Sequence, residues 1–409
     1  METTRTELSE VIDDIAAGPF GSNLKVSCFV EYGFPIIDGA NLKGYKVTDN
    51  VTKFVTEEKA RSLHRSIAKR GDVVVTISGT LGQVAYIPED SQFEEYLCSQ
   101  RQFRVTFNTD RIYPPYIVFY LHTWEGQHKI LAFANQTGVP ALSQPLKNFK
   151  KIIVDLPSLE EQKKIASYCE ILNDKIEENE RINKNLIQQV TALYDGFVKN
   201  SDWQVTTILD VAEKVAMGPF GSNIKVSTFV PEGVPIISGN HLRGYFLEEP
   251  EFNYITEEHA EHLKNSIVYP HDIIFTHAGN IGQVAMIPDG CKYERYILSQ
   301  RQFYLRCNEA KVVPEFILMF FHSASGQHEL LSYANQTGVP SIAQPATNLK
   351  KIPFKCPPIE MQLEWKAQVS PMIERYLNNR YENESLAALR DTLLPKLMSG
   401  EIDVSNIDP

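Results

Sequence analysis

A long pattern of apolar residues runs through residues 158–199. Steps of four and three residues from Ile165 to Phe197 land mostly on apolar side chains, which is the spacing of a helix that packs along a partner helix. Ser158 and Glu161 precede this stretch at the spacing of a capping box, in which each residue bonds the other's backbone amide. The pattern therefore predicts one long helix over 158–199.

The same steps recur 200 residues later, over 358–409, and both seams turn polar at matching positions, Asn179 with Asn183 and Asn379 with Asn383. Asparagines in an apolar seam set the register of paired helices, so we expect these helices to pair with each other. The alternative is that each belongs to a separate core. The predicted seam contains Ile165, Leu172, Ile176, Asn179, Asn183, Leu186, Val190, Leu193, Val369, Met372, Asn379, Asn383, Leu386, Leu393 and Leu397.

The asparagines leave the direction of the pair open. An antiparallel pair places Asn179 opposite Asn383 and Asn183 opposite Asn379, whereas a parallel pair matches Asn179 with Asn379. Symmetry favours the antiparallel pair, because it puts the two remaining parts of the chain at opposite ends of one rod.

Those remaining parts are two copies of one unit. A shift of 200 positions superposes them almost without gaps, and a repeat of this length is a duplicated domain and not a solenoid. The matching blocks include GPFGSN at 18–23 and 218–223, SQRQF at 99–103 and 299–303, and ANQTGVP at 134–140 and 334–340. Residues 46–55 and 104–120 differ most from their counterparts, which indicates one task performed on two objects or simply faster drift in loops.

Each copy has a mixed pattern. Two β-branched runs at 73–77 and 83–87 predict a hairpin, and 96–107 predicts another strand. Thr56 can cap a helix that ends at the Gly71 stop, and 115–134 predicts a second helix. We therefore expect an α+β fold. Its parts are two tandem mixed α/β domains at 1–157 and 200–357, separated by two long helices at 158–199 and 358–409 that form an antiparallel coiled coil.

Composition narrows the class of protein. The net charge of −11 argues against indiscriminate binding of polyanions, which normally needs a basic surface, although a local basic face remains compatible with it. The six cysteines form no CxxC pair and do not repeat with the domains, so we expect neither disulfides nor a metal site. No apolar run is long enough to cross a membrane, and we expect a cytoplasmic protein.

The search for catalytic motifs is negative. The chain has no GxxxxGK[ST], HExxH or GxSxG pattern, so GPFGSN is not a nucleotide-binding P-loop. His122 and His128 recur as His322 and His328, but two imidazoles without a third ligand are a weak metal site. We expect structural or hydrogen-bonding roles for them.

The repeat instead duplicates polar groups that suit nucleic-acid contacts. Asparagine and glutamine can pair with adenine, arginine and lysine with guanine, and serine, threonine and backbone amides often hold phosphate. GPFGSN is either such a phosphate contact or a plain structural turn. The candidates are Gly18, Gly21, Ser22, Asn23, Lys25, Lys43, Gln100, Arg101, Gln136, Thr137, Gln144, Gly218, Gly221, Ser222, Asn223, Lys225, Arg243, Gln300, Arg301, Gln336, Thr337 and Gln344.

This order of domain, helix, domain and helix resembles the specificity subunit of Type I restriction-modification systems over essentially the whole chain. The segments that resemble this family are the two GPFGSN turns, the GDVVVTISGTLGQVA and HDIIFTHAGNIGQVA blocks, TGVPALSQPLKNFKKIIVDLPSLEEQKKIA and the terminal LRDTLLPKLMSGEIDV. In the second copy Met361 and Pro358 replace the glutamate and serine of the cap.

The resemblance implies two target-recognition domains, each specific for one half of a split site in double-stranded DNA. It implies no catalysis by this chain, and no metal or cofactor bound to it. Two methyltransferase subunits with S-adenosylmethionine and two ATP- and Mg-dependent translocase/nuclease subunits would be its partners, with no membrane. The alternative function is a non-catalytic scaffold with two protein-binding domains on a coiled-coil rod. A self-contained nuclease or methyltransferase fits the motifs least.

Overall fold

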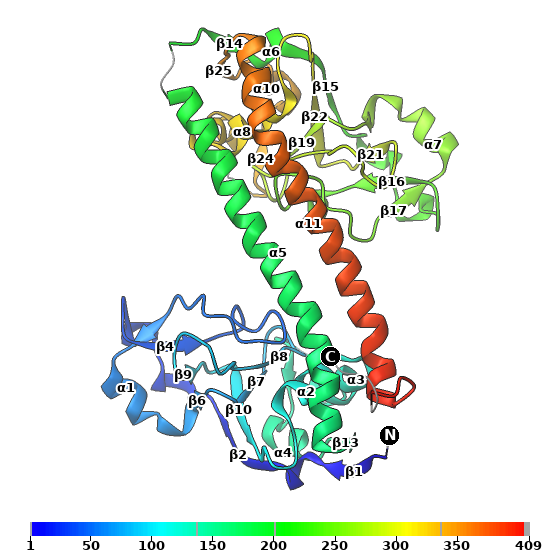
Figure 1. Ribbon diagram of the computed structural model, residues 1–409. Helices are drawn as coiled ribbons and strands as arrows, with labels where there is room; N and C mark the ends of the chain where they lie inside the picture. Colours follow the sequence, from blue (N-terminus) through cyan, green and yellow to red (C-terminus); the bar gives the residue numbers. More distant parts are fainter. Residues whose placement is uncertain (1, 136–137, 200–201, 336–337, 405–409) are drawn as a thin grey trace. The chain divides into compact units, whose positions relative to one another are not determined.

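The computed structural model describes residues 2–135, 138–199, 202–335 and 338–404 (Figure 1). Its internal contacts divide the chain into two compact units, Met1–Glu180 with Asn379–Pro409, and Arg181–Asn378. Each unit therefore contains one sequence repeat and half of each long helix. None of the described helices is both long and apolar enough to cross a membrane.

The first unit is built on two sheets. One has the strand order β2-β10-β7-β8 and the other β3-β5-β4-β9-β6. The central strands are buried on both faces, and helices α2 and α4 pack against the first sheet. The elements are β1 (Thr4–Glu7), β2 (Ile12–Ala17), β3 (Phe29–Val30), β4 (Phe34–Ile37), β5 (Phe54–Val55), α1 (Glu57–Ser62), β6 (Ile67–Lys69), β7 (Val73–Thr76), β8 (Val84–Tyr86), β9 (Glu95–Cys98), β10 (Gln102–Phe107), α2 (Pro114–His122), α3 (Trp124–Leu131), β11 (Ala134–Asn135), β12 (Ala141–Leu142), α4 (Pro145–Lys150), β13 (Ile153–Leu156) and α5 (Leu159–Lys199).

The second unit repeats this plan, with sheets in the orders β15-β22-β19-β20 and β17-β16-β21-β18. As in the first unit, two short strands, β14 and β25, pair just before the long helix begins. The elements are β14 (Val205–Thr207), α6 (Ile208–Val211), β15 (Ala212–Met217), β16 (Val234–Ile237), β17 (Asn253–Ile255), α7 (Glu257–His262), β18 (Ile267–Val268), β19 (Ile273–Thr276), β20 (Val284–Met286), β21 (Tyr296–Leu298), β22 (Gln302–Cys307), α8 (Pro314–His322), α9 (Ala324–Leu331), β23 (Ala334–Asn335), β24 (Ser341–Ile342), α10 (Pro345–Leu349), β25 (Pro353–Lys355) and α11 (Ile359–Ser399).

Several local predictions are confirmed. The two β-branched runs form the antiparallel pair β7 and β8. Thr56 caps α1, since its Oγ1 accepts a hydrogen bond from the amide of Lys59 at 3.2 Å. Ser158 and Glu161 form the expected cap, in which the Ser158 amide donates to the Glu161 carboxylate at 3.0 Å.

Three predicted elements are wrong in extent. The helix expected over 115–134 is two helices, because Thr123 leaves the helical conformation and caps α3 by accepting from the Gly126 amide at 3.1 Å. The strand expected over 96–107 is broken at 99–101, so β9 and β10 belong to different sheets. Helix α1 ends at Ser62, and the buried residues Ile67 and Ala68 form β6 beside β9.

The long helices pair antiparallel within each unit. In the first unit the side-chain amide of Asn179 donates to the side-chain oxygen of Asn383 at 2.9 Å, and Arg390 donates to Asn173 at 2.8 Å. Residue numbers thus rise along α5 as they fall along α11. In the second unit Asn183 donates to the carbonyl of Tyr376 at 3.2 Å. The predicted Asn179–Asn383 pair is confirmed, and the pair of Asn183 with Asn379 stays a prediction.

The helices also belong to the domain cores, so the two alternatives for the seam are both partly right. Ile165 and Cys169 lie in the core of the first domain, together with Leu397 from α11. Val190 and Val369 lie in the core of the second. Each domain is therefore fixed to both helices by buried apolar side chains.

The two domains contact the helices through different chemistry at one repeated position. In the first unit Lys46 forms ion pairs with Asp174 and, at 3.9 Å, with Glu177 of α5. In the second unit the equivalent residue is Phe246, which is 2% exposed and has its ring centroid 5.8 Å from that of Tyr376. The first contact is ionic and the second apolar.

Salt should therefore distinguish two substitutions. We expect Phe246→Ala to lower the free energy of unfolding by about 3–5 kcal/mol, because it leaves a cavity in the core. This loss should depend little on salt. Lys46→Met should lower the free energy of unfolding by about 1 kcal/mol or less at low salt and leave it unchanged at high salt, because partly exposed ion pairs are weak and are screened by salt. Chemical denaturation of the full chain at low and high NaCl measures both. Equal salt dependence of the two variants would contradict this assignment.

Candidate nucleic-acid interface

The GPFGSN turn is anchored by its first glycine. The Gly18 amide donates to the carbonyl of Gln102 at 2.8 Å. A Cβ at Gly18 would lie 1.8 Å from the carbonyl oxygen of Ser99, and one at Gly218 would lie 2.0 Å from that of Ser299. Any larger residue would collide with backbone, so both copies need glycine here for packing.

Gln100 and its counterpart Gln300 fasten the other end of the turn. The side-chain amide of Gln100 donates to the carbonyls of Gly21 at 2.9 Å and Leu24 at 2.8 Å. That of Gln300 donates to Gly221 at 2.6 Å and Ile224 at 3.1 Å. These amide donors have a structural role in both copies, and base contacts by these two residues stay a prediction.

The anchored turn presents polar and apolar groups to solvent. In the first copy Ser22, Asn23 and Lys25 are exposed, and Phe20 is 79% exposed. In the second copy Phe220 is 70% exposed, and Asn223 and Lys225 are exposed as well. Both domains therefore expose an aromatic ring and a lysine on the same turn.

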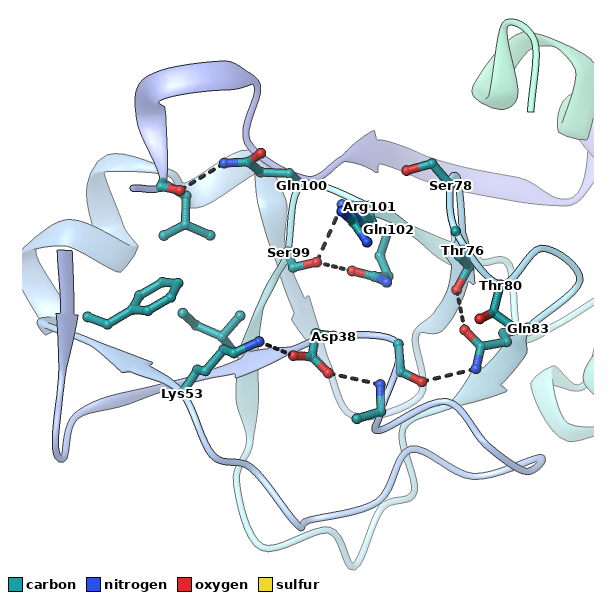
Figure 2. Close-up of a pocket in the computed structure, with 16 residues that line it drawn as sticks. Asp38, Lys53, Thr76, Ser78, Thr80, Gln83, Ser99, Gln100, Arg101 and Gln102 are labelled. Carbon is teal, nitrogen blue, oxygen red and sulfur yellow. Dashed lines mark hydrogen bonds and ion pairs between the residues drawn. The ribbon is translucent and has the colours of Figure 1, made fainter. Parts of the chain in front are cut away.

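An open cavity of about 570 Å³ lies beside this turn in the first domain. Figure 2 shows groups of hydrogen bonds among the residues that line it. The Ser99 hydroxyl bonds Gln102, the Thr76 hydroxyl donates to Gln83 at 3.0 Å, and the Gln83 amide donates to the carbonyl of Gly39 at 3.0 Å. We call Thr76, Gln83, Ser99 and Gln102 the polar frame.

The second domain has the same polar frame. The Thr276 hydroxyl donates to Gln283 at 3.1 Å, and the Gln283 amide donates to the carbonyl of Gly239 at 3.1 Å. Ser299 bonds Gln302 as Ser99 bonds Gln102. Because all of these residues repeat, the frame belongs to the common architecture of the two domains.

An ion pair also lines the cavity. The ammonium group of Lys53 lies 2.6 Å from the Asp38 carboxylate, with the side chains 46% and 23% exposed (Figure 2). Burial opposes ionisation of Asp38, but hydrogen bonds from Lys53 and from the Ala40 amide outweigh it and hold the pKa of the carboxyl below its usual value. Asp38 is therefore a charged acceptor at neutral pH.

Exposed cations surround the same cavity. Arg101 lines it and is exposed, as is Arg301 in the second copy. Lys53 lines the cavity as well and is exposed, so two exposed cations border it on a chain of net charge −11. Asp38, Lys53, Ser78 and Thr80 were missed by sequence reasoning. Their signal was that the residues at these four positions differ between the copies, three of them inside otherwise repeated blocks and Lys53 inside the divergent stretch 46–55.

The other predicted contact residues lie elsewhere or outside the described residues. Lys43 lines a separate cavity next to the long helices, and Arg243 is exposed. Gln144 and Gln344 are exposed and precede short helices with left-handed φ angles of 43° and 41°. Gln136, Thr137, Gln336 and Thr337 lie outside the described residues.

The duplicated histidines have structural surroundings. His122 bonds the carbonyl of Val84 at 2.7 Å, and His322 bonds that of Val284 at 3.0 Å. Burial lowers the pKa of both imidazoles, that of His322 to about 4. The expected structural role is confirmed for this pair. His128 stacks on the ring of Trp124. Within the described ranges, no group of three or more His, Cys, Asp or Glu could hold a metal ion.

Two domains with one polar frame, each carried on the same pair of helices, define a duplicated recognition protein. The chain belongs to the Type I restriction modification DNA specificity domain family, whose model matches residues 21–190 and 200–380. It is a specificity subunit with two target recognition domains, and it is not itself catalytic.

The chain is also similar to one curated protein and to solved structures. The chain is 22% identical over 384 residues to the Type I restriction enzyme MjaIX specificity subunit of Methanocaldococcus jannaschii, covering 86% of this chain and 82% of that protein. Its fold is similar to the crystal structure of a Type I S subunit from M. genitalium, with a TM-score of 0.57, 13% identity and coverage of 97% and 96% of the two chains. The HsdS subunit from Thermoanaerobacter tengcongensis matches with a TM-score of 0.36, 14% identity and coverage of 98% and 97%.

Proposed function

We propose that each target recognition domain reads one half of a bipartite DNA site, while the paired helices space the domains and dock methyltransferase subunits. The observation that carries this proposal is the polar frame, which is identical in both domains and is bordered by different residues in each. A shared polar frame with different surrounding residues fits two domains that recognise related but different DNA sequences. A scaffold with two equal protein-binding sites would have no need of this difference.

The partners of this subunit follow from its class. Assembly with other subunits and with DNA belongs to a Type I restriction-modification complex. We propose two methyltransferase and two translocase/nuclease subunits per complex. S-adenosylmethionine would bind the methyltransferase subunits, ATP and Mg the translocase subunits, and none of them this chain. We place the complex in the cytoplasm, because its DNA substrate lies there.

Binding of the complex to duplex DNA tests the proposed function. The chain is purified with its methyltransferase subunit and mixed with a library of random duplexes. We expect selection of a site with two defined halves and an undefined spacer. Equal binding to all duplexes would refute the proposal and favour the scaffold.

The lysine of the GPFGSN turn should contribute a sequence-independent contact. Each of Lys25→Ala and Lys225→Ala is expected to weaken binding to all duplexes alike and to reduce the slope of log affinity against log salt by about 0.9, as for one lost phosphate contact. Salt titrations of binding measure this slope. Lys184→Ala, at an exposed position of α5, is the matched control and should leave the slope unchanged. An unchanged slope for both turn variants would leave GPFGSN as a structural turn only.

A further inference from the structure

The two domains differ at defined positions on the border of the cavity. The polar frame is the same in both, whereas several lining positions differ. Among them are Asp38, Lys53 and Thr80 in the first domain, which correspond to Ser238, Asn253 and Asn280 in the second. Positions 53, 80, 253 and 280 are exposed in both copies, and 38 and 238 are partly exposed in both. We call these three pairs of positions the variable border.

The backbone presents the first pair in the same way. The Asp38 amide donates to the side chain of Asn41 at 3.1 Å, and the Ser238 amide donates to the ring of His241 at 2.9 Å. The backbone amide at 38 or 238 thus donates to the side chain three residues later in both copies, although that side chain is Asn41 in one and His241 in the other. An exchange between the copies should be tolerated by the fold.

The polar frame itself has little freedom to select a base. Thr76 and Gln102 are 1% exposed, Thr276 is 2% exposed and Gln302 is 1% exposed. Gln102 bonds Ser99 and Thr76 bonds Gln83 in the first domain, and Gln302 bonds Ser299 and Thr276 in the second. Buried groups that already have partners gain little from an additional ligand. Discrimination between bases must come from side chains that remain accessible, as those of the variable border do.

The side chains of the variable border differ between the two domains in charge and in hydrogen-bonding capacity. Asp38 only accepts hydrogen bonds and Lys53 only donates them, whereas Ser238 and Asn253 are neutral and do both. A carboxylate accepts from the amino group of cytosine, and asparagine pairs with the edge of adenine. Lys53, which is 46% exposed, can exchange its contact with Asp38 for one to a base or a phosphate.

We propose that two pairs of the variable border, Asp38 and Lys53 in the first domain and Ser238 and Asn253 in the second, make the two half-sites differ in sequence. This inference rests on the proposed function, since it assigns the residues by which each domain distinguishes its half-site. The first domain would prefer a base pair that offers an amino donor to Asp38, and the second a base pair that Asn253 can hold.

Reciprocal exchange of the border tests this inference. Asp38→Ser with Lys53→Asn gives the first domain the residues of the second at these two pairs, and Ser238→Asp with Asn253→Lys does the reverse. Each variant is assembled with its methyltransferase subunit and used to select duplexes from a random library. We expect each exchange to change the preference at one or two base pairs of its own half-site by about 5- to 150-fold, with the other half-site unchanged.

The control removes an ion pair outside the cavity. Glu57 and Arg61 form an exposed pair on α1 at 2.8 Å, and Glu57→Gln with Arg61→Gln leaves the net charge unchanged, as the first exchange does. Its selected site should equal that of the unmodified protein. Thermal unfolding identifies any variant that fails to fold, and the reciprocal variant then decides the outcome.

Two results would overturn the inference, and they differ in meaning. If the unmodified complex selects a two-part site and a folded exchange variant selects the same one, the variable border does not set specificity. If the unmodified complex selects no site, the proposed function fails, and the inference fails with it.

Discussion

Val190→Asp should unfold the second unit or reduce its stability by several kcal/mol. Val190 lies on α5, is 1% exposed, and belongs to the same buried cluster as Trp365 and Val369 of α11. A carboxylate at this position would lose its hydration without gaining a partner, and burial of such a group costs several kcal/mol. Since a domain is stable by only about 5–15 kcal/mol, the loss is a large share of the total.

A neighbouring position gives the control for this variant. Gln188 is exposed on the same helix, and Gln188→Asp should change the free energy of unfolding by no more than about 0.5 kcal/mol. Chemical denaturation of the full chain compares the two. Equal stability of both variants would show that Val190 is not buried between the helices and the second domain.

Gln162→Leu should weaken the attachment of the first domain to its helix. Gln162 is 0% exposed in the first turns of α5. Its side-chain oxygen accepts from the Tyr113 amide at 2.9 Å, and its side-chain nitrogen donates to the carbonyls of Arg111 at 3.1 Å and Pro157 at 3.0 Å. Leucine would leave these buried groups without partners, at a cost of about 2–5 kcal/mol in the free energy of unfolding.

The second copy repeats this contact and supplies the control. Gln362 accepts from the Val313 amide at 2.9 Å and donates to Pro357 at 2.7 Å, so Gln362→Leu should have a similar effect on the second unit. The counterpart of Glu161 in that copy is Met361. Glu161→Met should lower the free energy of unfolding by about 1 kcal/mol or less, because the helix cap is lost. If Gln162→Leu cost no more than Glu161→Met in denaturant unfolding, the buried contacts would not stabilise the domain.

The long helices could be predicted because their signal is local. Apolar spacing, the cap at Ser158 and the matching asparagines all follow from helix geometry, and the Asn179–Asn383 hydrogen bond confirms the inferred register. The sequence could not show that each half-helix also enters a domain core, because Ile165 and Leu397 meet only through tertiary packing.

The recognition surface was less predictable for the same physical reason. The side chain of Gln100 matches that of a base reader, yet its amide bonds backbone carbonyls 76 and 79 residues away. Asp38 and Lys53 were overlooked because they come from separate segments, which the pairing of β4 with β5 brings together. The repeat did mark both positions, since each differs between two otherwise similar copies.

Exchange of one whole domain tests most directly whether each domain reads one half of the site. Residues 1–157 are replaced by the corresponding segment of a related specificity subunit, and methylated adenines are mapped in DNA from cells that produce the assembled complex. We predict a new sequence in one half of the methylated site and an unchanged second half. A change in both halves, or in neither, would contradict the assignment of one half-site to each domain.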